Sequence, residues 1–353
     1  MRTHEQEHDE LRAFVQALPK AELHLHLEGS ITPELALALA TRHGVRLPGA
    51  EGGSEGLRAA WRFPDFAAFI ATYLAISRCL QTADDLVEVI DDLAGRLVAQ
   101  NVRHVELTFT PMTHVDRGVS VDALVHGLVE GRAAARSRGL SLGFVFDIVR
   151  SLPDRAAPTL AFARAVRRRD RDAVVGLGLG GPEGEQYPLA EIARVFARAR
   201  AEGMHSLPHA GEQSGAASVR AAIELLGAER IGHGIRCLED PALVDELVAR
   251  GVALEVCPSS NVALGIVATL AEHPLPQLLA AGLRVSLASD DPTLFATDLV
   301  EEYVRCATAF GWSRAELRAL ASAGLEHAFV GEAERAAWRA DGGAAVDDTV
   351  DDR

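Results

Sequence analysis

The sequence has few cysteines and a shortage of positive charge. Its four cysteines, at positions 79, 237, 257 and 306, lie far apart and form no C-x-x-C pair, a pattern typical of reduced thiols in the cytoplasm. The 35 lysines and arginines are outnumbered by 50 aspartates and glutamates, which gives a formal net charge of −15. A surface of that sign repels phosphate backbones and anionic membranes, so we expect neither nucleic acid nor a membrane as a partner.

Long apolar runs are also missing. No run approaches the roughly 18 residues that a membrane span requires, and the N-terminal stretch is too polar and acidic for a signal peptide. Hydrophobic residues make up 48% of the chain and charged residues 24%, as in ordinary globular proteins. We expect a single domain over residues 11–340, flanked by disordered tails at 1–10 and at the acidic, glycine-rich stretch 341–353.

Strands and helices alternate regularly along the sequence. Short apolar or alternating runs predict eight strands, each followed by helical periodicity. They cover residues 21–27, 102–110, 141–148, 174–181, 205–210, 230–235, 252–257 and 284–289. Eight such units indicate an α/β fold of the closed (β/α)8 type, the TIM barrel. A helical stretch over residues 31–100 is predicted as an insertion after the first strand.

Large apolar side chains recur within this insertion at mostly three- and four-residue spacings. They are Trp61, Phe63, Phe66, Phe69, Ile70 and Tyr73. That spacing predicts a helix with an apolar face. Two interpretations remain open: the helix covers a pocket as an apolar lid, or it packs in the core of an inserted helical subdomain.

The first predicted strand carries two histidines. Three leucines alternate with His24 and His26, so both imidazoles lie on one face of the strand, about 7 Å apart. At that separation they can share one metal ion. The alternative is the outward polar face of an ordinary amphipathic strand.

More metal-binding side chains follow at the ends of later strands, where the active site of such a barrel lies. His209 ends the fifth strand, and Asp290 and Asp291 end the eighth. Three imidazoles and one carboxylate around an open position suit a zinc ion that activates water. We therefore expect one zinc ion per chain, with the ligands His24, His26, His209 and Asp290.

Neighbouring polar residues suit proton transfer and substrate binding. Glu212 lies one turn beyond His209 and is expected to act as a general acid and base. His233, at the end of the sixth strand, is expected to orient the attacking water, and Asp291 to bind a donor on the substrate. The fourth strand ends in glycines over 178–181 rather than in a lysine or glutamate that bridges two metals, so one metal is favoured. These glycines also let a planar ligand approach the backbone closely.

Five ordered motifs resemble those of the adenosine deaminase family. They are KAELHLHLEGS at 20–30, HAGE at 209–212, RIGHG at 230–234, CPSSN at 257–261 and SDDP at 289–292. The resemblance extends from about residue 18 to about residue 329, with the family's order and spacing. It implies a zinc-dependent hydrolytic deaminase that acts on the six-amino group of a purine.

The resemblance also implies particular contacts. They are Glu212 with the ring nitrogen N1, His233 with the attacking hydroxide, Asp291 with N7, and the backbone N–H of Gly181 with N3. Glu28, at the same strand end as His26, faces the 5′ end of the sugar. We expect Glu28 to accept a hydrogen bond from a free 5′-hydroxyl beside His26, which favours adenosine as the substrate. The alternative is a carboxylate that only braces the loop before Gly29.

A few stretches depart from the usual family pattern. The block GGPE at 180–183, with FPDF at 63–66 and TFTP at 108–111, is more similar to a bacterial branch that includes the aminodeoxyfutalosine deaminases. That branch lacks an acidic residue at the Glu28 position. The first hypothesis is the deamination of adenosine to inosine and ammonia. The alternatives are a 5′-modified adenosine such as aminodeoxyfutalosine, or adenine, and, outside the enzymes, a non-catalytic purine-binding barrel.

Overall fold

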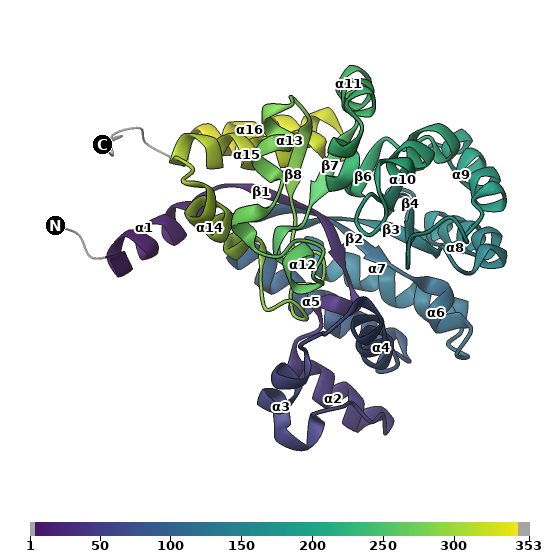
Figure 1. Cartoon of the computed structure of the whole chain (residues 1–353). Helices are drawn as coiled ribbons and strands as arrows, with labels where there is room; N and C mark the ends of the chain where they lie inside the picture. Colours follow the sequence, from purple (N-terminus) through teal and green to yellow (C-terminus); the bar gives the residue numbers. More distant parts are fainter. Residues whose placement is uncertain (1–3, 345–353) are drawn as a thin grey trace.

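Eight parallel strands follow one another around a barrel in the order of the sequence (Figure 1). A computed structural model describes residues 4–344. The strands are β1 (Lys20–His26), β2 (Val102–Phe109), β3 (Ser141–Val149), β4 (Val174–Gly180), β5 (His205–Ala210), β6 (Arg230–His233), β7 (Ala253–Val256) and β8 (Arg284–Leu287). Each strand pairs with the next in the parallel sense, so the predicted (β/α)8 barrel is confirmed.

The barrel closes where its last strand returns to its first. An isolated parallel bridge joins Leu25 to Asp290, just beyond the end of β8. The N–H of Asp290 donates to the carbonyl of His24, and the N–H of His26 donates to the carbonyl of Asp290, both at 2.9 Å. This backbone pairing therefore places Asp290 beside the two histidines of β1.

Helices surround the barrel on its outside, as Figure 1 shows. They are α1 (His4–Ala17), α2 (Pro33–His43), α3 (Gly53–Ala60), α4 (Phe66–Ser77), α5 (Ala83–Ala99), α6 (Pro111–Val115), α7 (Val121–Ser137), α8 (Ala156–Arg169), α9 (Ala190–Ala201), α10 (Ala216–Ala221), α11 (Pro241–Arg250), α12 (Pro258–Ala263), α13 (Leu275–Ala280), α14 (Leu299–Phe310), α15 (Arg314–His327) and α16 (Glu332–Ala344). None of the helices within residues 4–344 is long and apolar enough to cross a membrane.

Four of these helices, α2 to α5, lie between β1 and β2, where the sequence predicts an insertion. Capping residues set their limits. Thr32 accepts a hydrogen bond from the N–H of Leu35 at the start of α2, and Thr82 forms a capping box with Asp85 at the start of α5. In Figure 1, α2 and α3 project from the barrel, whereas α4 lies against it. The insertion thus brings α4 to one end of the strands.

The two predicted tails are more ordered than the sequence suggests. Helix α1 begins at His4, and the guanidinium of Arg12 donates to Glu301 of α14 at 2.6 Å. Helix α16 continues to Ala344, and the buried ring of Trp338 packs against Leu325. Residues 4–10 and 341–344 are therefore helical because each helix is attached to the barrel, a contact that composition does not reveal. The rest of the predicted tails, 1–3 and 345–353, lies outside the described residues.

A buried arginine holds several strands together inside the barrel. The side chain of Arg230 on β6 donates to Glu106 of β2 at 2.5 Å, to Glu255 of β7, and to the carbonyl of His327 at 2.8 Å. Burial alone would raise the pKa of Glu106, but the charge of Arg230 lowers it to about 2. The charge of Arg230 between the two carboxylates is therefore the main reason that both stay ionised inside the protein.

Replacement of Arg230 by methionine is expected to destabilise the protein strongly. The variant leaves Glu106 and Glu255 buried without their main counter-charge, which should lower the free energy of unfolding by about 3–5 kcal/mol. Urea unfolding of native and variant protein measures the difference. The matched control is Arg138→Met, which removes an exposed pair with Asp91 and should cost below about 1 kcal/mol. Equal losses in the two variants would contradict the role given to Arg230.

Candidate active site

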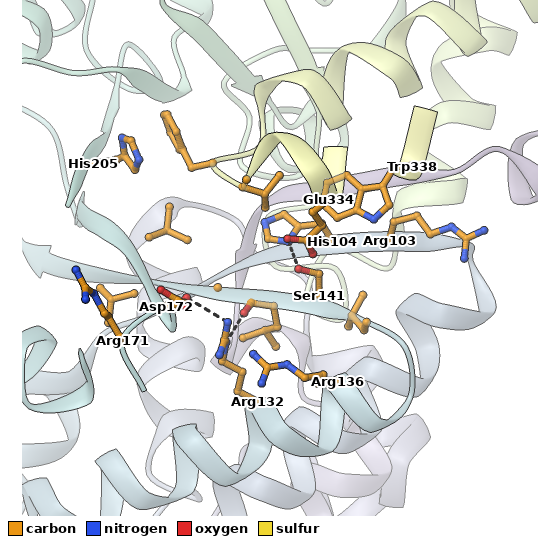
Figure 2. A pocket seen from close by; sticks show the side chains of 18 of the residues that line it. Arg103, His104, Arg132, Arg136, Ser141, Arg171, Asp172, His205, Glu334 and Trp338 are labelled. Atoms are coloured by element: carbon orange, nitrogen blue, oxygen red, sulfur yellow. Dashed lines mark hydrogen bonds between the residues drawn. The ribbon is translucent and has the colours of Figure 1, made fainter. Parts of the chain in front are cut away.

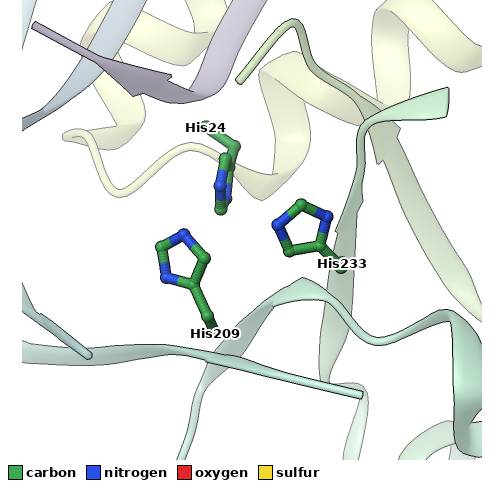
Figure 3. Close-up of side chains that lie close together, drawn as sticks. All are labelled: His24, His209 and His233. Carbon is green, nitrogen blue, oxygen red and sulfur yellow. The ribbon is translucent and has the colours of Figure 1, made fainter. Parts of the chain in front are cut away.

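Four histidines from three strands converge at the carboxyl end of the barrel. His24 and His26 share one face of β1, His209 lies near the end of β5, and His233 ends β6. The ring centre of His24 is 4.5 Å from that of His209 and 5.0 Å from that of His233. Figure 3 shows these three rings directed towards a common centre. The second histidine of β1 joins them, with its ring centre 5.2 Å from that of His209.

Asp290 completes this group from the opposite side of the barrel seam. Its Oδ1 lies 3.6 Å from His24 Nε2 and 3.4 Å from His26 Nε2. His26 Nε2 in turn lies 3.2 Å from His209 Nε2. The structure thus brings together all four side chains that the sequence nominates as metal ligands. Asp290 and His233 both have a left-handed backbone, with φ of 61° and 62°, a strained conformation that is typical of functional sites.

These side chains have the chemistry that a divalent metal such as zinc requires. His24 Nε2 and His209 Nδ1 are buried and have no hydrogen-bond partner within the described residues. Burial lowers the pKa of His26 to about 4 and that of His209 well below its usual range, so both imidazoles are neutral. Neutral imidazoles and one carboxylate form a common zinc donor set. The donor set therefore fits zinc, with His24, His26, His209 and Asp290 as the residues that would hold it.

A second carboxylate, which the sequence analysis missed, orients one of these histidines. Glu255 Oε2 lies 2.6 Å from His24 Nδ1, so this nitrogen carries the proton and Nε2 is left for the metal. Burial alone would lower the pKa of His24, but the carboxylates of Asp290 and Glu255 raise it well above its usual value. The two carboxylates that favour a proton on the His24 ring also favour the binding of a metal cation beside it. The sequence contained a feature that could have identified Glu255, since it is the one acidic residue in an otherwise apolar strand.

Replacement of Glu255 by glutamine should weaken metal binding. The amide keeps the size of the side chain but removes the charge that polarises His24, which typically lowers metal affinity about 10- to 100-fold. Zinc titration of the metal-free protein against a competing chelator measures the change. Glu229→Gln is the matched control, because Glu229 contacts His205 Nδ1 at 2.8 Å at the other end of β5. Unchanged zinc affinity in the Glu255 variant would contradict its orienting role.

Glu212 lies in the pocket on a loop that another carboxylate holds in place. Glu183 accepts hydrogen bonds from the N–H groups of Gly211 at 3.0 Å, Glu212 at 2.9 Å and Gln213 at 3.2 Å. Gly211 has a φ of 69°, and a Cβ there would lie 2.4 Å from a methyl group of Val219. Burial, followed by the charges of nearby carboxylates, raises the pKa of Glu212 to about 8. Glu212 therefore carries a proton at neutral pH and can donate it.

The other predicted site residues also border the same pocket. Asp291 Oδ1 is buried and has no hydrogen-bond partner within the described residues, and burial raises the pKa of this carboxyl well above its usual value. Gly181 has a φ of 87° at the opposite wall. His233 Nε2 lies 3.9 Å from both Glu212 and Asp290, which places it between the predicted proton donor and a predicted metal ligand. The pocket has a volume of about 110 Å3, well below the roughly 300–1,000 Å3 of sites for drug-sized ligands.

Aromatic side chains of α4 cover this pocket. Phe66, Phe69 and Tyr73 line it, and Phe69 also stacks on Phe295 with 5.2 Å between ring centres. The two interpretations of the aromatic segment are therefore compatible, because α4 packs on the barrel and forms a pocket wall at once.

Glu28 lies behind this wall rather than on it. Its Oε1 is 2.9 Å from His114 Nε2, and its Oε2 accepts a hydrogen bond from the hydroxyl of Tyr73, also at 2.9 Å. The side chain is 1% exposed and does not line the pocket. Both carboxylate oxygens therefore have partners within the protein, whereas the sequence suggested an acceptor for a sugar hydroxyl. Neighbours in the sequence could not reveal Tyr73 and His114, which reach Glu28 from other elements.

A carboxyl that the sequence analysis did not single out lines the pocket as well. Asp147 projects from β3, the strand between Ser141 and Val149, in which it is the only charged residue. Burial raises its pKa to about 8. A charged residue within an apolar strand is the sequence feature that could have identified Asp147.

A larger cavity, of about 780 Å3, lies at the opposite end of the strands (Figure 2). Arg132 and Arg136 of α7 and His205, at the start of β5, border it. The ring of His205 stacks on Phe329 with 3.6 Å between ring centres. In barrels of this type the amino ends of the strands contribute stability, and the chemistry occurs at the carboxyl ends. Cavity size therefore does not identify the active site here.

Fold and site together define a hydrolase barrel of the amidohydrolase kind. The family described as Adenosine deaminase matches residues 19–341, and the chain belongs to that family. An adenine deaminase of Rhodospirillum rubrum is 40% identical over 93% of this chain and 97% of its own length. An aminodeoxyfutalosine deaminase of Streptomyces coelicolor is 39% identical over 91% of this chain and 82% of its own length.

Two solved structures have the same architecture. A crystal structure of an adenine deaminase from Arthrobacter aurescens matches with a TM-score of 0.86 and 35% identity, over 93% of this chain and 98% of that one. An amidohydrolase from Burkholderia ambifaria, solved with bound zinc, matches with a TM-score of 0.84 and 28% identity, over 98% of this chain and 93% of that one. Hydrolytic deamination is therefore the general activity of the relatives, whereas their substrates differ.

Proposed function

We propose that the protein deaminates adenine hydrolytically to hypoxanthine and ammonia. The observation that carries this choice is the burial of Glu28 behind the pocket wall, where Tyr73 and His114 bind its two oxygens and the carboxylate does not face a sugar hydroxyl in the pocket. The pocket of about 110 Å3 favours a bare base over a nucleoside. The 40% identity to an adenine deaminase supports the same choice. Adenine, an alternative in the sequence analysis, therefore replaces adenosine as the first hypothesis.

The proposed roles follow from the positions of the side chains around a purine ring. Glu212 donates a proton to N1, Asp291 donates to N7, and the N–H of Gly181 donates to N3. His233 orients the attacking water. The water oxygen bonds to C6, and the bond from C6 to the amino nitrogen breaks. One water proton leaves with the amino group as ammonia, and the other replaces the proton that Glu212 gave to N1. The raised pKa values of Glu212 and Asp291 support donor roles for both carboxyls.

One zinc ion per chain is part of the proposal. His24, His26, His209 and Asp290 form a single donor set, and the zinc-bound amidohydrolase supports this metal. Zinc at this position lowers the pKa of a water molecule, so that it is nucleophilic near neutral pH. The four cysteines are buried and free of disulfides, which supports the cytoplasm as the place of action.

The variant Glu212→Gln should lose about 10²- to 10⁴-fold in kcat, because the amide cannot transfer a proton. Zinc content, measured by elemental analysis, should stay near that of the native protein. In the native enzyme, kcat/KM should fall as the pH rises through about 8, where Glu212 loses its proton, and the variant should lack this decline. A variant with near-native turnover would assign proton transfer to another group.

Aminodeoxyfutalosine is the second candidate substrate, because a deaminase of that compound is 39% identical to this chain. The ultraviolet shift on deamination separates the candidates when adenine, adenosine and aminodeoxyfutalosine are compared at equal enzyme concentration. Adenine should give the highest kcat/KM. A higher value with aminodeoxyfutalosine would overturn the first choice in favour of the second, and ammonia release from none of the three would overturn both.

A further inference from the structure

Asp147 is a buried polar side chain that the proposed roles leave unused. It is 3% exposed, it borders the pocket, and its Oδ1 has no hydrogen-bond partner within the described residues. A carboxyl oxygen of Asp147 lies within 4.8 Å of ring nitrogens of His26 and His209. A buried polar atom without a partner is costly, so such atoms in native proteins usually serve a ligand. The unpaired oxygen therefore points to a contact with the substrate.

The neighbouring strand is shaped around this carboxyl. A Cβ at Gly178 would lie 2.0 Å from Asp147 Oδ1, and a Cβ at Gly180 would lie 2.5 Å from Asp147 Oδ2. Any other residue at either position would push the carboxyl from its place. Two glycines of β4 thus make room for Asp147 in the pocket wall, beside the Gly181 amide that is proposed to reach the substrate.

The order of the strands shows which edge of a purine Asp147 meets, given the proposed function. Glu212 follows β5 and contacts N1, and Gly181 follows β4 and contacts N3. The next strand in the sheet is β3, which carries Asp147. The next nitrogen around the purine after N1 and N3 is N9. One step along the sheet therefore corresponds to one step around the ring.

We propose that Asp147 accepts a hydrogen bond from N9–H of a free purine base and thereby selects bases over nucleosides. A substituent on N9 removes the only donor at this edge and also meets the carboxyl sterically. This inference rests on the proposed deamination of adenine and adds the residue that sets its substrate class.

The experiment compares adenine with 9-methyladenine, which lacks N9–H. In the native enzyme kcat/KM should be at least about 100-fold higher for adenine, since a site that hydrogen-bonds an N–H rejects analogues without it. Asp147→Ala should lower kcat/KM for adenine by about 10- to 1,000-fold, without a loss for 9-methyladenine. Asp147→Asn keeps an acceptor oxygen of the same reach and should retain most of the preference. Val149→Ala enlarges the pocket from the same strand and should leave the preference in place.

Each outcome decides between the two proposals. A native enzyme that deaminates adenine and 9-methyladenine equally well would overturn the role of Asp147 and leave the proposed function standing. A native enzyme inactive on adenine would overturn the proposed function itself. Equal losses on both substrates in Asp147→Ala, or loss of zinc by elemental analysis, would make Asp147 a structural or metal-binding residue instead. If the alanine variant does not fold, Asp147→Ser, which is polar but too short to reach N9, replaces it in the same comparison.

Discussion

The buried charge of Arg230 is the interaction on which the interior of the barrel depends. Burial alone would raise the pKa of Glu255, but Arg230 and then His24 lower it, so this carboxylate remains ionised. The ionised Glu255 in turn holds the proton of His24 on Nδ1. Through Glu255, the guanidinium of Arg230 therefore contributes to the state of an imidazole in the candidate site. Structural stability and site chemistry are coupled here through one chain of contacts.

The pocket combines carboxyl groups of opposite protonation state within a small volume. Asp290 stays ionised because histidines surround it, whereas Glu212 and Asp291 are neutral because burial and the charge of Asp290 oppose a second and a third anion. A neutral carboxyl group can donate a hydrogen bond, whereas an ionised carboxylate can bind a cation. Carboxyl side chains in one pocket can therefore serve both purposes. The difference comes from position alone, as in other enzymes that separate the pKa values of paired carboxyls.

Sequence periodicity was sufficient for the architecture, and motif spacing was sufficient to predict which histidines and carboxyls meet at one end of the barrel. Their roles as metal ligands and proton donor stay predictions. Both signals are local, because each strand and each motif is a continuous stretch. Glu255, Asp147 and Glu183 were missed because their importance depends on the neighbouring strand that they face, which the register of the barrel decides. The environment of Glu28 was misjudged for the same reason, since Tyr73 reaches it from the inserted helix α4. Contacts between distant segments of the chain were therefore the features that could not be predicted from a single sequence.

The seam between β1 and β8 has a consequence for the newly made chain on the ribosome. His24 and His26 emerge early in synthesis, and Asp290 emerges only after more than 260 further residues. The backbone pairing of Asp290 with His24 and His26 closes the barrel and completes the donor set in one event. An incomplete chain therefore has neither a closed sheet nor a full set of ligands. Closure of the barrel and completion of the proposed metal site therefore depend on the same late segment of the chain.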